Sequence, residues 1–302
     1  MKFRTDGYHL LTPDQVLFKG LTLAQIDPEG CKSRKRMIYK FEKEYGMSPL
    51  DVASVWYDLV VGPGEDDGLS VKDISARGFT MFLMAINFLW KCPKNCTDLS
   101  NKFHIGERQC RGQPFWDWVE KIAALKRKKI RFEFGEEVYL LSVDGVDFDI
   151  WEPKHDTINK DPRQMSHKSH HGAVKYEIAI SVHRPQVMWI SGPHSGGKND
   201  YTIFKEGLQQ MIPDGKLGIA DRGYGRESNK KVSLPSKQDS KELHNYKARV
   251  RCRHETFNGR IKKFDSMSKT WRYGAEKHGY AFEAVVVLCQ YTMENGFPLY
   301  DA

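Results

Sequence analysis

Val138-Tyr-Leu-Leu-Ser-Val-Asp144 marks the point where the hydrophobic pattern of the chain changes its period. Before residue 131 the apolar residues recur every three or four positions, which is typical of helices; after it the period is close to two, which is typical of strands. We expect a strand here that ends at Asp144-Gly145, with Val146–Trp151 continuing as an extended segment. The C-terminal half of the chain is therefore predicted to be built on a sheet.

The rest of this half alternates strand-like and helix-like patterns. Val174–Val182 and Gln186–Ser191 are β-rich runs joined by Arg184-Pro185, which favours an antiparallel meander. The elements expected after them are a helix over Asp200–Ile212, a short buried strand over Leu217–Ala220, a polar loop over 225–244, and helices over Asn245–Phe264 and Glu276–Glu294. This order predicts an α/β fold, a mixed sheet with flanking helices, of which the RNase H-like fold is the best-known version.

A helical segment precedes the sheet. The pattern predicts a helix over 79–90 that is broken at Cys92-Pro-Lys-Asn95, and a short helix over 97–103 with Thr97 as its N-cap. A turn at Gly106 and a longer helix over 114–125 follow. This resembles a helix-turn-helix, but a small helical subdomain without DNA contacts explains it equally well. The expected domains are residues 1–70, of unknown role, a small all-α helix-turn-helix-like domain over 71–130, and the sheet domain over 131–302.

Composition limits the class of protein. The 302 residues carry 47 Lys and Arg against 39 Asp and Glu, a formal charge of +8, and six cysteines. The apolar content supports a substantial core, the cysteines are too sparse for a disulfide framework, and no apolar run is long enough to span a bilayer. We expect a soluble intracellular protein without a membrane partner; the modest positive charge favours a polyanionic partner only slightly.

Three acidic residues stand at informative positions. Asp144 is expected at the end of the first strand, Asp221 at the end of the fourth strand, and Glu255 within the basic helix over 245–264. Two aspartates from neighbouring strand ends and a glutamate from a helix across them supply the hard oxygen ligands that Mg²⁺ or Mn²⁺ prefers. Such a site can activate water and stabilise the leaving oxygen of a phosphodiester. Taken singly, each acid is more often a turn or surface residue.

The helix that carries Glu255 is strongly basic. Arg253, Lys262 and Lys263 are the residues that we expect to contact a nucleic acid backbone. Gly259 and Lys262 share the face of Glu255, and a glycine there leaves room for a closely approaching strand. Arginine-rich helices are also common as plain solvated surfaces.

In combination these motifs resemble those of a DDE-superfamily endonuclease of the Harbinger-like transposase kind. The matching stretches are Val143-Asp-Gly145, Ser191-Gly-Pro-His-Ser-Gly-Gly-Lys-Asn-Asp-Tyr-Thr-Ile-Phe204, Ala220-Asp-Arg-Gly-Tyr224, Asn245, and Arg253-His-Glu-Thr-Phe-Asn-Gly-Arg-Ile-Lys-Lys-Phe264. The resemblance covers about residues 135–300 and, loosely, 75–125. The chain departs from the family's pattern in having Val146 after the Asp-Gly pair and a further acid at Asp147.

The resemblance implies an RNase H-like fold, a divalent metal (Mg²⁺ or Mn²⁺) held by Asp144, Asp221 and Glu255, and cleavage and joining of double-stranded DNA at transposon ends. It also implies a nuclear location, assuming a eukaryotic host, with a separate DNA-binding protein and a homo-oligomer as further expected partners. A domesticated transposase-derived DNA-binding protein without catalytic activity is the main alternative. A stand-alone nuclease acting on RNA or hybrids fits the same metal site.

Two zinc-site hypotheses remain open beside these. Cys92, Cys96, His104 and Cys110 are zinc-compatible ligands, although their spacing departs from common finger patterns. His167, His170 and His171 form the second set, in a polar loop.

Overall fold

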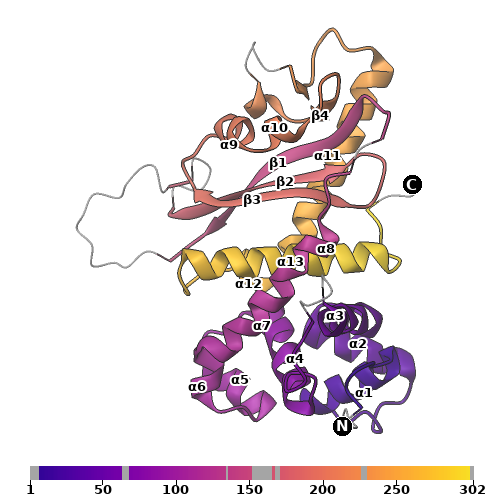
Figure 1. Cartoon of the computed structure of the whole chain (residues 1–302), viewed down its shortest axis with the longest axis vertical. Coiled ribbons are helices and arrows are strands. Elements are labelled where there is room, and N and C mark those ends of the chain that lie inside the picture. The colour runs from indigo at the N-terminus through magenta and orange to yellow at the C-terminus, as the bar shows by residue number, and fades with distance from the viewer. Residues whose placement is uncertain are drawn as a thin grey trace, which may run out of the picture. The chain divides into compact units, whose positions relative to one another are not determined.

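The computed structural model describes residues 7–62, 68–133, 135–151, 165–166, 171–225 and 230–299 (Figure 1). The chain forms two compact units. The first consists of Met1–Lys128 with Lys263–Lys269 and Tyr280–Phe297, and the second of Lys129–Lys262 with Thr270–Gly279 and Pro298–Ala302. The first division of the chain, between Lys128 and Lys129, lies close to the expected boundary at residue 130, whereas no division falls at residue 70, and two later segments join the first unit.

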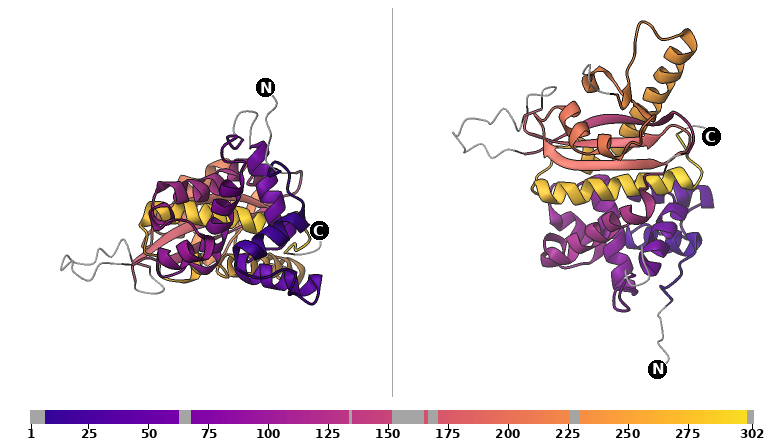
Figure 2. Two further views of the ribbon diagram at one scale, coloured as in Figure 1. Left: turned by 90° about the horizontal axis from the view of Figure 1, so that it is seen from below. Right: turned by 45° about the horizontal axis from the view of Figure 1, so that its top comes forward.

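The first unit is all-helical (Figure 2). Its helices are α1 (Pro13–Leu23), α2 (Arg34–Tyr45), α3 (Pro49–Val61), α4 (Ala76–Lys91), α5 (Cys96–Phe103), α6 (Glu107–Arg111), α7 (Gln113–Ala124) and α12 (Asp265–Ser268), with the short α8 (Lys126–Lys129) at its end. Capping boxes begin α1 and α3: Thr12 pairs with Gln15, and Ser48 pairs with Asp51. The N-terminal region is thus as ordered as the helices after it.

One aromatic cluster joins α3, α4 and α7. The ring of Trp56 lies 5.1 Å from Phe79, 5.2 Å from Phe82 and 6.0 Å from Trp118, measured between centroids. These rings are buried, and large aromatic side chains contribute most to core stability per residue. Because this core draws on residues from both sides of position 70, the segments 7–62 and 76–124 belong to one structural unit.

The helix-turn-helix-like segment differs from the sequence-based expectation. A short helix, α6, occupies the region between α5 and α7 where only a turn was expected, and Asn95 rather than Thr97 caps α5. The α7 helix is largely buried, and Asp117 and Glu120 stand among its partly exposed residues. Lys121 is partly exposed on the same helix, so α7 presents charges of both signs.

The second unit contains a mixed five-stranded sheet in the order β3-β2-β1-β4-β5. The strands are β1 (Tyr139–Asp149), β2 (Ala173–Ser181), β3 (Val187–Ser195), β4 (Leu217–Ile219) and β5 (Val232–Ser233). Strands β1, β2 and β3 form the expected antiparallel meander, whereas β4 pairs parallel with β1 and β5 parallel with β4. With its flanking helices, this α/β architecture is compatible with an RNase H-like fold.

Helices pack on the sheet. In Figure 1, α9 (Asp200–Glu206) and α10 (Leu208–Met211) lie together beside β1. They share a buried cluster with the strands, which includes Leu141, Val143, Phe204, Leu208 and Tyr224. Helix α11 (Lys241–Ile261) contacts β1 and β4 instead, and places Val250 against Ile219. The last long helix, α13 (Ala275–Glu294), contributes its first residues to this unit and the rest to the helical unit.

Asp144-Gly145 does not end the first strand. The pairing of β1 with β2 continues without interruption from Leu141 to Asp149. A glycine followed by polar residues is usually a turn signal, but here β2 supplies a partner for every residue of the run. Asp144 therefore lies in the middle of the central strand and not at its end.

Candidate active site on the central strands

Asp144 lies within β1, and Asp221 lies just beyond the end of the neighbouring parallel strand β4. The register of β1 and β4 pairs Ser142 with Ile219, and each aspartate follows its member of this pair by two residues. Adjacent strands are about 4.8 Å apart, which brings the two backbones close at this level. The sequence expectation that these acids share one region of the sheet agrees with this register.

Asp144 is held by hydrogen bonds to both carboxylate oxygens. Oδ1 accepts from the backbone N–H of Gly145 at 2.9 Å, and Oδ2 accepts from Nδ2 of Asn258 on α11 at 3.1 Å. One helical turn earlier, Nδ1 of His254 lies 2.9 Å from the hydroxyl oxygen of Ser142. Ser142 and Asp144 are two residues apart on β1 and point to the same face, and their partners His254 and Asn258 are one turn apart on α11. Two polar contacts therefore hold α11 on this face of β1.

Asp221 begins a short turn of 3-10 helix, η2 (Arg222–Tyr224). Its Oδ1 accepts a hydrogen bond from the backbone N–H of Gly223 at 2.8 Å, which is the usual role of an aspartate at an N-cap. The residue is exposed. One carboxylate oxygen is thus oriented by the backbone, at the carboxyl end of a parallel strand, where ligands commonly bind in α/β sheets.

The pKa of the Tyr224 phenol responds to the charges of nearby carboxylates. Burial raises the pKa of the Tyr224 phenol well above its ordinary value, and the nearby carboxylates of Glu177, Asp200, Asp144 and Asp221 raise the pKa further. Of these four residues, Asp144 lies on the face of β1 that α11 covers, whereas Glu177, opposite Gly145, lies on the face that α9 covers.

Asp200 and Glu177 carried no assigned role in the sequence expectation, and both lie on the opposite face of the sheet from the Asp144 side chain. Asp200 is the first residue of α9, and Glu177 lies on β2 opposite Gly145. Burial raises the pKa of Glu177 to about 8, with a smaller upward contribution from Asp200. Asp200 lies within one of the family-like stretches, but only the fold brings it to the strand that carries Asp144.

Glu255 stands apart from the two aspartates. It is exposed on α11, and within the part of the chain that the structure describes it has no hydrogen bond or ion pair with Asp144 or Asp221. Asn258, three residues later on the same side of the helix, makes the contact with Asp144 instead. Glu255 is thus carried by the helix that contacts both β1 and β4, with its side chain exposed.

The three basic residues expected to meet DNA fall into two groups. Arg253 is half-buried, and its Nη1 donates to the backbone carbonyl of Val182 at 3.3 Å. Lys262 and Lys263 are exposed, with the Lys262 ammonium 6.0 Å from the centre of the Phe148 ring. A Cβ placed on Gly259 would meet nothing within 4 Å, so the surface beside Glu255 is open.

Within the described residues, no three His, Cys, Asp or Glu side chains stand close enough together to hold a metal ion. This applies to Cys92, Cys96, His104 and Cys110, of which Cys110 is buried with its Sγ 3.6 Å from the carbonyl of Ile105. Of the three loop histidines, His167 and His170 lie outside the described residues, and His171 is exposed.

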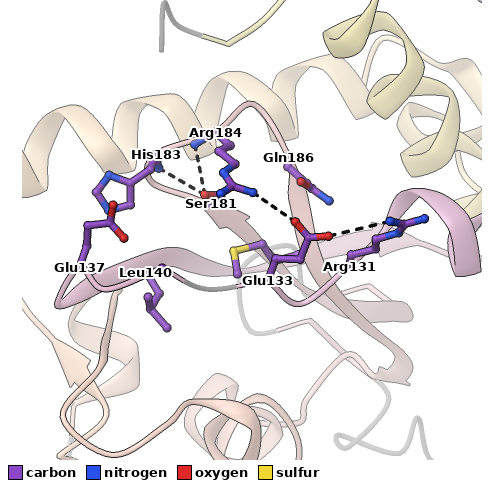
Figure 3. Close-up of a pocket in the computed structure, with 10 residues that line it drawn as sticks. Arg131, Glu133, Glu137, Leu140, Ser181, His183, Arg184 and Gln186 are labelled. Carbon is purple, nitrogen blue, oxygen red and sulfur yellow. Dashed lines mark hydrogen bonds and ion pairs between the residues drawn. The ribbon is translucent and has the colours of Figure 1, made fainter.

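A pocket near the start of β1 offers no alternative site (Figure 3). Its volume is about 60 Å³, enough for very few water molecules. Glu133 lies between two arginines in it, 3.2 Å from Arg184 and 4.0 Å from Arg131, so its charges are largely balanced internally. Neither its size nor its charge suits a substrate.

No described helix is long and apolar enough to cross a membrane. Comparisons of the chain with protein-family models, with curated proteins and with solved structures find no match.

Proposed function

We propose that this protein is a metal-dependent DNA endonuclease and transposase of the DDE type, with an RNase H-like catalytic unit. The observation that supports this most directly is that Asp144 on β1 and Asp221 just after β4 each follow the paired residues Ser142 and Ile219 by two positions, in a sheet ordered β3-β2-β1-β4-β5. Phosphoryl transfer by such a site needs carboxylates from neighbouring strands that share one cation.

The acidic region fits Mg²⁺ or Mn²⁺ in its chemistry. The three proposed ligands, Asp144, Asp221 and Glu255, all offer carboxylate oxygens, which these hard cations prefer. In the proposal Asp144, Asp221 and Glu255 hold the metal. When bound, the metal lowers the pKa of a water nucleophile and stabilises the leaving oxygen.

The chain's own residues orient these groups. Asn258 fixes the rotamer of Asp144, and the Gly223 N–H fixes that of Asp221. Glu255 lies on the flank of α11 beside the open surface at Gly259, where a long glutamate side chain is free to turn. Lys262 and Lys263 follow the end of α11 directly and are exposed. In the proposal their ammonium groups bind the phosphates of duplex DNA.

Recognition of transposon ends requires a DNA-binding surface outside the acidic site. Because α7 presents charges of both signs, we assign end recognition to a separate DNA-binding partner protein, or to another surface of the helical unit. A homo-oligomer would hold two ends together, and a nuclear location in a eukaryotic host follows from the substrate.

The experiment is cleavage of supercoiled plasmid by the purified protein with Mn²⁺. We expect metal-dependent nicking by the wild type, and its loss in Asp144→Asn, Asp221→Ala and Glu255→Ala. Glu242→Gln is the matched control, because Glu242 is another exposed glutamate on α11. Equal nicking by all variants would reject the acidic site.

The exposed position of Glu255 favours a second candidate, a domesticated DNA-binding protein without catalytic activity. In such a protein the hydrogen bond from Asn258 to Asp144 only connects α11 to β1 within the fold. A folded wild type that binds DNA but nicks neither plasmid nor pre-cut ends, and whose DNA affinity is the same in Asp221→Ala, would support this candidate.

A further inference from the structure

Helix α2, labelled in Figure 1, carries a row of basic side chains on its outer side. The outer positions, which we call the basic face, are Lys35, Arg36, Tyr39, Lys40 and Lys43. They recur at steps of three and four residues and therefore line one side of the helix. The opposite side packs into the helical unit through Met37, Phe41 and Tyr45. The helix is thus divided into a buried apolar side and a basic outer side.

The charges of the basic face are not balanced by acids. Within the part of the chain that the structure describes, none of its four cations forms an ion pair. Glu44 of the same helix bonds instead with Lys91 of α4 and Lys102 of α5. Burial, and then the charge of Asp51 on α3, raise the pKa of Glu42, the other acid of α2. Four positive charges therefore add up on one surface.

The first turn of α2 is charged against the helix dipole. Arg34, Lys35 and Arg36 occupy this turn, which holds no acid. Cations are disfavoured at this end of a helix, because its backbone N–H groups already carry partial positive charge. Asp14 forms a 2.7 Å ion pair with Arg34, but both side chains are 65% exposed, so water screens this contact. An anionic ligand would relieve the remaining repulsion.

The helical unit holds α2 firmly behind its basic face. The Tyr45 hydroxyl donates a 2.8 Å hydrogen bond to the carbonyl of Gly20 on α1, and the Trp90 indole donates at 3.1 Å to the carbonyl of Lys43. A Cβ built on Gly20 would stand 2.4 Å from the Phe41 ring, so α1 and α2 are in close contact. The backbone of the basic face is therefore fixed before any ligand binds.

The surroundings of α2 limit the kind of polyanion that this face suits. A membrane-binding helix needs its apolar side available to lipid, whereas Phe41 and Tyr45 lie in the core of the unit. Single-stranded nucleic acid is usually held by several stacking aromatic rings, and Tyr39 is the one exposed aromatic residue of α2. A regular row of phosphates needs only spaced cations and hydrogen-bond donors, which the basic face supplies.

We propose that the basic face of α2 is a second DNA-binding surface, through which the helical unit binds the phosphate backbone of duplex DNA. The choice of duplex DNA as the polyanion rests on the proposed function, whereas the surface itself is argued from charge. From Arg36 to Lys43 the helix rises about 10 Å, a length over which one DNA strand carries about three phosphates. Such contacts bind without reading base sequence, and they weaken as salt rises.

The test is fluorescence anisotropy of the full-length protein with a labelled DNA duplex of mixed sequence, over a series of salt concentrations. The test variant combines Arg36→Gln, Lys40→Gln and Lys43→Gln. We expect the slope of log affinity against log salt to fall by about two to three, and affinity at about 0.1 M salt to fall tenfold or more. Circular dichroism and thermal melting should match the wild type, because the three side chains are at least partly exposed.

A matched control removes three charges from other exposed positions of the same unit. It combines Lys72→Gln, Arg77→Gln and Arg108→Gln, before α4, in α4 and in α6. Its slope should change by less than about one. Equal losses in the control and the α2 variant would mean that only the net charge matters, and a wild-type slope in the α2 variant would remove DNA from this face. Either result rejects the inference.

Two further probes identify another occupant. If the α2 variant keeps its affinity for the duplex but loses binding to a single-stranded oligonucleotide, or to vesicles containing phosphatidylserine, duplex DNA is the wrong ligand. Nicking of supercoiled plasmid with Mn²⁺ is scored separately in the same preparations. A wild type that does not nick rejects the proposed function, whereas a reduced slope in the α2 variant would still support the DNA-binding surface.

Discussion

The side-chain amide of Asn258 donates a 3.1 Å hydrogen bond to Oδ2 of Asp144, from the helix to the central strand. Groups that orient a metal-binding carboxylate usually matter about 10–100-fold for metal affinity or activity. We expect Asn258→Ala to raise the Mn²⁺ concentration needed for half-maximal nicking by about tenfold, while unfolding stability falls by only about 1 kcal/mol. Thr256→Ala, on the exposed side of α11, should change neither quantity. An unchanged Mn²⁺ requirement in Asn258→Ala would show that Asp144 needs no such support.

Two glycines of the second unit should respond to alanine with opposite signs. Gly145→Ala forces a Cβ against Asp200, and overpacking of this kind costs about 1–3 kcal/mol. Gly259→Ala meets open space within a helix and should stabilise the protein by about 0.5–1 kcal/mol, because alanine favours the helix. Urea unfolding of the two variants measures both values, and a stable Gly145→Ala would contradict the placement of Asp200.

Arg253 and Lys262 should differ in the salt dependence of DNA binding. Each phosphate contact contributes close to 0.9 to the slope of log affinity against log salt. We expect Lys262→Ala to reduce the slope by about one, with Lys263→Ala similar, whereas Arg253→Ala leaves the slope unchanged. Arg253→Ala should instead lower unfolding stability by about 1–2 kcal/mol, because it removes a partner of the Val182 carbonyl. A reduced slope in Arg253→Ala would place that residue on DNA.

His278 should make the free energy of unfolding depend on pH. Its ring is buried between Trp271, Phe148 and Tyr176, with Nδ1 2.8 Å from the Tyr176 hydroxyl oxygen, and burial lowers the pKa of His278 to about 3. Tyr176 is the one titratable group that the structure places against the ring among the described residues. In the unfolded chain the His278 ring binds a proton near pH 6.5, whereas in the folded chain it stays neutral at that pH. The contribution of His278 to the free energy of unfolding is therefore at its maximum above pH 6.5.

As the pH falls from 6.5 towards 3, His278 should cost about 1.4 kcal/mol of stability per pH unit. Denaturant unfolding between pH 4 and 7 measures this slope. His278→Gln should flatten the slope by about that amount, and His244→Gln, an exposed position on α11, should leave it unchanged. A His278→Gln variant with the wild-type slope would assign the acid sensitivity to other groups.

Several elements could be predicted from the sequence, because local pattern alone decides them. The apolar runs of β2 and β4 and the helical period of α4 and α13 gave boundaries within three residues of those observed. Elements that depend on a partner were missed. Strand β5, only Val232–Ser233, lies in a region that reads as a polar loop and exists because β4 pairs with it.

Local signals also failed where two candidates compete. Asn95 and Thr97 are both residue types that commonly cap helices. In the structure Asn95 caps α5, and the Thr97 hydroxyl instead hydrogen-bonds to Glu107 on α6. The expected helix over 200–212 divides at Gly207 into α9 and α10. Such choices depend on contacts between elements, which no local pattern contains.

The sequence by itself determined the α/β class, the antiparallel meander, and the place of Asp221 directly after a short buried strand. Strand alternation and the hydrophobic period are properties of neighbouring residues, so they can be read along the chain. Only the tertiary structure decided that Asn258 and not Glu255 contacts Asp144, and that Asp200 reaches Gly145. Those contacts depend on how α11 is rotated about its own axis and on where α9 packs against the sheet. Both are decided by packing against residues that are far away in the sequence.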